Sequence, residues 1–125
     1  MATEKKIQTI EEKEKVKPII LKMEDGEEFT LEFSRESIRF AEARGFDIDE
    51  VAKYPMTRVP ELFWYAFRMH HPRISKEQAE RILIDDMGGM PKGMAERLGQ
   101  LYAAPFEALS SDDGERKNCK VTVEM

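Results

Sequence analysis

This 125-residue chain has one cysteine, no excess of positive charge and few long hydrophobic runs. Cys119 is the single cysteine, so no disulfide bond can form within the chain. The formal net charge of −5 argues against a protein that binds nucleic acid through a broad basic surface. Residues 2–17 are almost all polar and lack the hydrophobic region of a signal peptide. We therefore expect a cytoplasmic protein that binds neither nucleic acid nor a membrane.

The densest apolar stretch is the segment 57–71, TRVPELFWYAFRMHH. It is much shorter than the roughly 20 apolar residues that span a bilayer. A helix that is apolar nearly all round must instead be covered by other parts of the protein. We expect a central core helix that is capped by Thr57, has Pro60 in its first turn and buries Trp64 and Phe67.

A β-hairpin is predicted over about residues 19–33. Apolar and polar residues alternate from Phe29 to Phe33, which is the pattern of a half-buried strand. The preceding Asp25-Gly26 pair favours a two-residue hairpin loop. Two strands alone are marginally stable in water, so the apolar face of the hairpin must pack on helices.

Capping residues and glycines place further helices on both sides of the central one. Ser34 begins a helix that Gly45 ends in a Schellman motif, and a short acidic helix follows at about 47–54. Ser75 and Gln78 form a capping box at the start of the next helix, which the Gly88-Gly89 pair ends. A last helix, at about 91–108, carries an apolar face made of Met94, Leu98, Leu101, Tyr102 and Phe106.

These elements predict an α+β fold that is mostly α-helical, with an N-terminal β-hairpin packed on a bundle of four to five helices. The length suits one domain, which we place at residues 18–109. We expect a flexible lead-in at 1–17 and a flexible tail at 110–125, because both ends are highly charged and show no apolar period.

No group of residues in the sequence combines a nucleophile, a base and an orienting side chain. Adjacent helix residues point about 100° apart, so His70 and His71 are not expected to chelate one metal ion. Cys119 lies in the expected tail, and the pairs Asp85-Asp86 and Asp112-Asp113 are typical of solvated charge. We therefore expect no enzyme activity, no metal site and no cofactor.

Met87, Met90 and Met94 surround the Gly88-Gly89 break and have two interpretations. They are either core residues of the adjoining helices or an apolar patch that faces a partner. Methionine adapts well to a partner surface, because its side chain is long, unbranched and polarizable. These three residues are the candidate partner-binding site that the sequence offers.

The order of several motifs over residues 19–109 resembles a known family. The motifs are LEFSRESIRFAEARGFDIDEV, then PMT, then the aromatic helix that ends in His70-His71, and then LGQLYAAPFEAL. This arrangement is similar to the tail assembly chaperones of siphophages and prophages of Gram-positive bacteria.

The resemblance implies a protein that binds the tape-measure protein, keeps its hydrophobic helical segments in solution and recruits tail-tube subunits. Such chaperones are absent from the mature virion and have no catalytic residues, and self-association would fit their role. Two other classes stay open: a head–tail connector or tail-completion subunit retained in the virion, and a host-directed regulator or inhibitor that binds one host protein or nucleic acid. The net negative charge disfavours nucleic acid in the second class. Neighbouring tail-tube and tape-measure genes would favour the chaperone.

Overall fold

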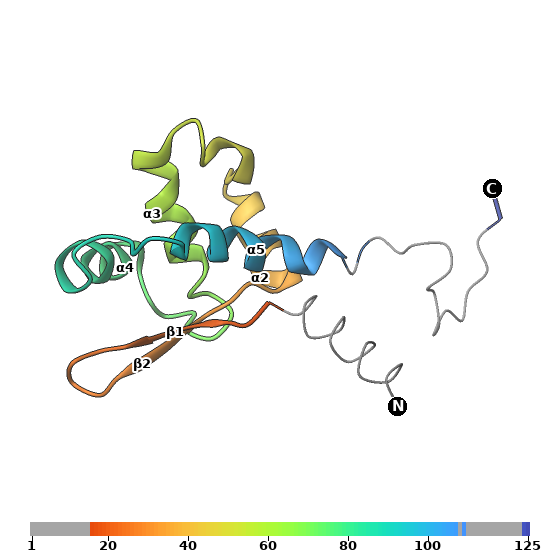
Figure 1. The fold of residues 1–125 in the computed structure, drawn as a ribbon. Coiled ribbons are helices and arrows are strands. Elements are labelled where there is room, and N and C mark those ends of the chain that lie inside the picture. The colour runs from red at the N-terminus through yellow and green to blue at the C-terminus, as the bar shows by residue number, and fades with distance from the viewer. Residues whose placement is uncertain (1–15, 108, 110–123) are drawn as a thin grey trace, which may run out of the picture.

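The computed structural model describes residues 16–107, 109 and 124–125 of the chain. Within them a two-stranded antiparallel sheet precedes four α-helices, which confirms the α+β class (Figure 1). The strands are β1 (Ile19–Lys22) and β2 (Glu28–Leu31), and the helices are α2 (Arg35–Ala43), α3 (Pro55–Tyr65), α4 (Lys76–Arg81) and α5 (Met94–Glu107). A 3₁₀-helix, η1 (Ile48–Glu50), precedes α3, and a π-helical segment, η2 (Ile82–Asp86), continues α4.

The hairpin has the predicted strands but a different loop. Lys22 pairs with Glu28, and the Met23 N–H donates to the Glu27 carbonyl at 2.8 Å, so three residues, Glu24 to Gly26, form the loop. Gly26 has a φ of 92°, and its N–H donates to the Met23 carbonyl at 3.0 Å. This is the type I turn with a glycine bulge, and the expected two-residue loop is therefore wrong.

Helix α2 begins and ends as the sequence predicts. Ser34 and Ser37 form a reciprocal capping box at its start. At its end the N–H groups of Gly45 and Phe46 donate to the carbonyls of Glu42 and Ala41, each at 3.0 Å. Gly45 has a φ of 89° and Phe46 is buried, which completes the Schellman motif with its hydrophobic contact.

Helix α3 begins earlier than predicted. Its first residue is Pro55, and Tyr54 is the capping residue without a side-chain bond, so Thr57 lies inside the helix. Proline is favoured at the first helical position because its φ is already helical, and this preference outweighs the capping tendency of Thr57. Pro60 is consequently in the helix interior, where it cannot donate a hydrogen bond to the Met56 carbonyl.

The helical bonds of α3 give way to successive turns over residues 66–70. Phe67 is fully buried as predicted, whereas Trp64 is only partly buried. The Trp64 indole N–H donates to the Ile74 carbonyl at 2.9 Å. The tryptophan therefore lies near the surface, with its polar atom satisfied by the loop before α4.

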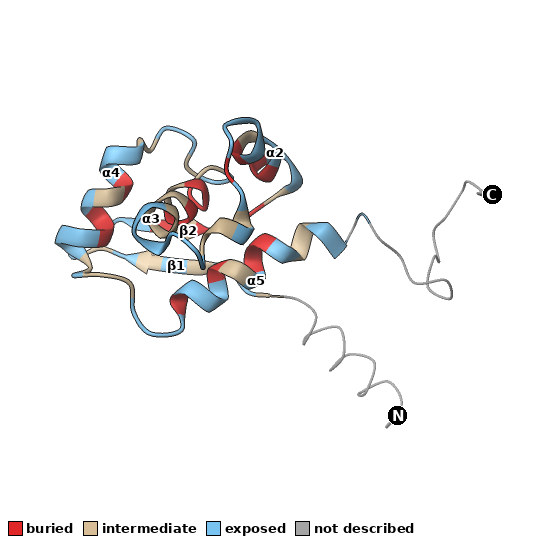
Figure 2. Cartoon of the chain, turned by 90° about the horizontal axis from the view of Figure 1, so that it is seen from above, coloured by how far each residue is buried: buried red, intermediate tan, exposed pale blue. Residues whose placement is uncertain are grey.

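Helix α5 runs through Pro105 to Glu107, so the proline does not interrupt it. Met94, Leu98, Leu101 and Tyr102 are buried, but Phe106 is 40% exposed. Figure 2 shows the buried part of α5 beside the rest of the domain and its last turn exposed. The apolar face predicted for this helix therefore extends beyond the part that the domain buries.

One hydrophobic core joins the hairpin to the helices. Phe29 and Leu31 of β2 contribute their buried side chains to it, while Glu28, the first residue of β2, is exposed. The aromatic rings of Phe63, Phe67 and Phe29 pack edge to face at its centre. Among the described residues, no helix combines the length and the apolar character needed to cross a membrane.

Candidate partner-binding surface

The three methionines selected from the sequence lie against the core. Met94 is 9% exposed, and Met87 and Met90 are partly buried hydrophobic residues that pack on the core. The π-helical turn brings the Met87 N–H to the Ile82 carbonyl at 2.8 Å, and Gly88 and Gly89 follow with positive φ angles. Met87 and Met90 therefore keep part of their side chains exposed at this corner, whereas Met94 is buried in this conformation.

The two histidines hold the hairpin to the turns that follow α3. The Thr30 N–H donates to His71 Nε2 at 2.9 Å, and His70 Nε2 lies 2.8 Å from Glu32 Oε1. Between these two contacts, the Glu32 N–H donates to the Ala66 carbonyl at 3.0 Å. The free edge of β2 is thus paired with the end of the aromatic segment, and the adjacent histidines have separate structural partners.

Nε2 of His71 must be unprotonated to accept the hydrogen bond from the Thr30 N–H. Burial lowers the pKa of His71, the charge of His70 lowers it further, and Glu27 acts in the opposite direction. Within the described residues, no cluster of three or more histidine, cysteine, aspartate or glutamate side chains could hold a metal ion. Cys119 and Asp112-Asp113 lie outside the described residues.

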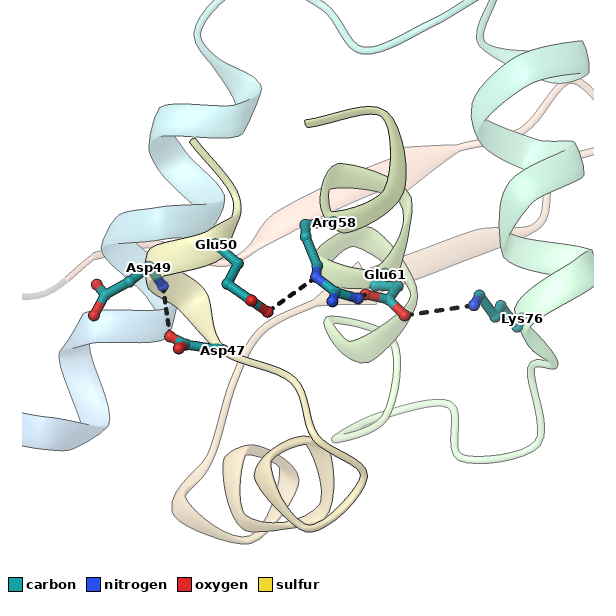
Figure 3. Close-up of polar contacts among 6 residues, drawn as sticks. All are labelled: Asp47, Asp49, Glu50, Arg58, Glu61 and Lys76. Atoms are coloured by element: carbon teal, nitrogen blue, oxygen red, sulfur yellow. Dashed lines mark hydrogen bonds and ion pairs between the residues drawn. The ribbon is translucent and has the colours of Figure 1, made fainter. Parts of the chain in front are cut away.

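A set of ion pairs joins η1, α3 and α4 (Figure 3). Arg58 Nη1 lies 2.7 Å from Glu61 Oε1 and Arg58 Nε lies 3.2 Å from Glu50 Oε1, while Lys76 Nζ lies 3.5 Å from Glu61 Oε2. The hydrogen bond to Glu61 is the main reason why the pKa of Arg58 is raised. Arg58 Nε and Glu50 Oε1 form an ion pair without good hydrogen-bond geometry, and the buried Nε atom has no hydrogen-bond partner. These charges connect elements and do not face an apolar pocket.

The exposed side of α2 carries arginines and borders two hollows. The wider one, about 1180 Å³, lies between α2 and residues 68–72 and is lined by Arg35, Arg39, Phe40 and Arg68 among others. Two guanidinium groups lie over the Phe40 ring, those of Arg68 at 4.0 Å and Arg44 at 5.1 Å from its centroid. Such stacking holds the arginine side chains in place while their charges stay accessible.

The second hollow is narrow and largely apolar, and we call it the α2–α5 groove. It has a volume of about 110 Å³ and is lined by Arg35, Ile38, Arg39, Glu42, Pro105, Phe106 and Leu109. Leu109 is 64% exposed and Phe106 is 40% exposed, whereas Ile38 is 4% exposed and forms the floor. Phe106 also packs on Tyr102, with ring centroids 5.7 Å apart. The groove is the place where exposed apolar residues from two elements line one depression.

The α2 side of the groove follows from helix geometry. Arg35, Ile38, Arg39 and Glu42 have the i, i+3, i+4, i+7 spacing that places residues along one helix face. Among the residues that the structure describes, neither Arg35 nor Arg39 forms an ion pair. This surface is not predicted from the sequence, because charged residues at this spacing on a short helix usually indicate a solvent-exposed face.

The comparisons with known proteins add one family. The model of the family described as "Domain of unknown function (DUF5055)" matches residues 6–125, and the chain belongs to that family. Neither a curated protein nor a solved structure matches the chain.

Proposed function

We propose that this protein is a phage tail assembly chaperone that binds helical segments of the tape-measure protein through the α2–α5 groove. It acts in the cytoplasm of the host bacterium, helps to recruit tail-tube subunits and is absent from the mature virion. It works as a binding protein and not as an enzyme. The motif order over residues 19–109 supports this proposal, and so does the presence of exposed Phe106 and Leu109 beside Ile38 in one groove.

The groove has a volume of about 110 Å³, which suits side chains from one face of a helix that lies across it. Two helices, α2 and α5, form its sides, and apolar side chains form its floor and one edge. An amphipathic helix binds such a groove by placing residues at i, i+3, i+4 and i+7 against it. A tape-measure chain rich in apolar helices would be shielded from aggregation by this contact, because its apolar face would be removed from water.

The groove replaces the methionine corner as the proposed contact surface. Met94 lies in the core, and Met87 and Met90 pack against it. Opening that corner for a partner would expose core surface, which carries a free-energy cost of about 25 cal/mol for each Å² of apolar area. The exposed leucine and phenylalanine of the α2–α5 groove need no such opening.

The test is co-expression with the tape-measure protein of the same phage or prophage, followed by co-purification. Leu109→Gln removes apolar surface from the groove without adding charge, and Ile84→Gln is the matched control. The two side chains are almost equally exposed, at 64% and 62%, and Ile84 lies in η2, outside the groove. Full burial of a leucine contributes about 1.5–3 kcal/mol. We therefore expect Leu109→Gln to lower the amount of bound tape-measure protein roughly tenfold and Ile84→Gln to leave it unchanged.

Both variants should keep the circular dichroism spectrum and melting temperature of the parent protein, because both residues are exposed. Equal binding by the parent and Leu109→Gln would refute the groove as the contact surface. No binding of tape-measure protein by the parent would refute the chaperone function itself. Mass spectrometry of washed virions distinguishes the structural-subunit alternative, since stoichiometric amounts there would contradict a chaperone that leaves before maturation.

A further inference from the structure

We infer that the segment bound in the α2–α5 groove is an amphipathic helix whose apolar ridge is flanked by carboxylates that pair with Arg35 and Arg39. This inference rests on the proposed function and specifies the chemistry of the partner segment. It also predicts a preferred direction for that helix across α2.

The charges along the groove carry the inference. Arg35 and Arg39 are exposed on α2, lie about 6 Å apart along the helix axis and both line the groove. Glu42, roughly one further turn along, also lines it. The α2 side of the groove therefore changes from two positive charges at its beginning to one negative charge at its end.

The positive charges of Arg35 and Arg39 contrast with the negative net charge of the protein. The chain has a formal net charge of −5, which disfavours an acidic partner for the protein as a whole. Arg35 and Arg39 also line the wider hollow with Arg68, so three guanidinium groups and the single carboxylate of Glu36 surround this side of α2. An acidic segment would be attracted to this side and repelled elsewhere, which selects both the partner and its position.

The apolar residues of the groove determine which type of partner segment can bind there. Ile38 and the exposed residues Phe106 and Leu109 offer a short apolar surface between the charged rims. A helix with apolar residues at i, i+3 and i+4 covers that surface, and the positions beside its ridge then lie over the rims. Carboxylates there would meet Arg35 and Arg39, and a lysine or arginine one or two turns away would meet Glu42.

The test uses overlapping synthetic peptides that cover the tape-measure sequence, with binding measured by fluorescence anisotropy. The peptides that bind best should be amphipathic helices with aspartate or glutamate beside the apolar ridge. The double variant Arg35→Glu, Arg39→Glu should bind such a peptide roughly tenfold more weakly, and raised salt should weaken binding by the parent protein. The variant Arg35→Lys, Arg39→Lys should retain most of the affinity. The double variant Arg73→Glu, Lys92→Glu, at two exposed positions outside both hollows, is the control matched in charge.

Charge exchange gives the decisive result. A peptide with its flanking carboxylates changed to lysine should bind the Arg35→Glu, Arg39→Glu variant better than it binds the parent protein. Failure of this exchange, together with loss of binding by Leu109→Gln, would refute the acidic-helix inference and leave the proposed function intact. If neither Leu109→Gln nor the charge reversal changes binding, the groove itself is refuted.

The chain's own residues 110–125 contain Asp112 and Asp113 and are a rival occupant. A variant that ends at Leu109 separates the two cases, because a groove filled by its own tail would bind the acidic peptide more tightly after truncation. Unchanged affinity supports the partner helix as the occupant. A large increase in affinity would overturn the assignment and identify the tail as the resident segment.

Discussion

Replacing Phe67 with alanine should remove a large part of the stability of the domain. Phe67 is fully buried, and its ring packs edge to face on Phe63 and Phe29, with centroids 5.1 and 5.5 Å away. It also lies 6.4 Å from the His71 ring, so the substitution would leave a cavity where the hairpin meets α3. Truncation of a buried phenylalanine costs about 3–5 kcal/mol, from lost burial and from the cavity. Domains of this kind are stable by only about 5–15 kcal/mol in total.

Urea unfolding, followed by tryptophan fluorescence and by circular dichroism, measures this loss. Trp64 is close to the substituted site in sequence and reports on the same region, while circular dichroism reports on all helices. Met56→Ala is the control, since Met56 is 90% exposed and its truncation should change stability by less than about 0.5 kcal/mol. If Phe67→Ala is unfolded in water, Phe67→Leu supplies a measurable intermediate. A loss below about 1 kcal/mol for Phe67→Ala would refute the central position of this ring.

Two further predictions concern a histidine and a glycine. The pKa of His71 is lower in the folded protein than the unfolded value of about 6.5, so its stabilising contribution is complete above that pH and is lost as the pH falls below it. Stability measured between pH 7 and 5.5 should therefore decline, and His71→Gln should reduce this decline; an equal decline in both proteins would refute the role of the Thr30–His71 hydrogen bond. Gly45→Ala should cost about 1–2 kcal/mol, because Gly45 has a φ of 89° and no nearby atom would contact the added Cβ, which isolates the backbone strain. An unchanged urea midpoint would show that the Schellman motif tolerates a side chain there.

Local sequence signals predicted the elements whose determinants are short-range. The Schellman motif needs only Gly45 and a following apolar residue, and the capping box needs only Ser75 and Gln78, so both could be found from spacing. The strand alternation at Phe29 and Leu31 likewise predicted which side chains are buried. These features depend on residues within one or two turns of each other.

Predictions were wrong where two local preferences compete. Asp25-Gly26 is compatible with a two-residue turn and with a three-residue loop, and the pairing of Lys22 with Glu28 determines which one forms. Thr57 is a good capping residue, but Pro55 begins the helix two residues earlier. Strand pairing decides between the options at the hairpin loop, and the preference of proline for the first helical position decides at the start of α3.

The candidate surface depends on long-range packing, which explains why the sequence favoured another place. Methionines beside a glycine pair are a reasonable signal for an adaptable surface, yet Met94 completes the core and Met87 and Met90 cover it. Conversely, Arg35 and Arg39 acquire an apolar neighbourhood only because the end of α5 lies beside α2. No periodicity within α2 could indicate that neighbour.

The last turn of α5 shows how one apolar pattern can serve two purposes. Leu98, Tyr102 and Phe106 follow one another at i, i+4 and i+8, and the first two are buried by the domain. The helix then continues past the core, so the same stripe reaches solvent at Phe106 while still contacting the Tyr102 ring. An apolar stripe that extends beyond the core exposes apolar side chains to water unless another surface covers it. The exposed end of the α5 stripe lines one groove with the Arg35–Glu42 face of α2. For this reason we propose that the partner helix binds at this end of the protein.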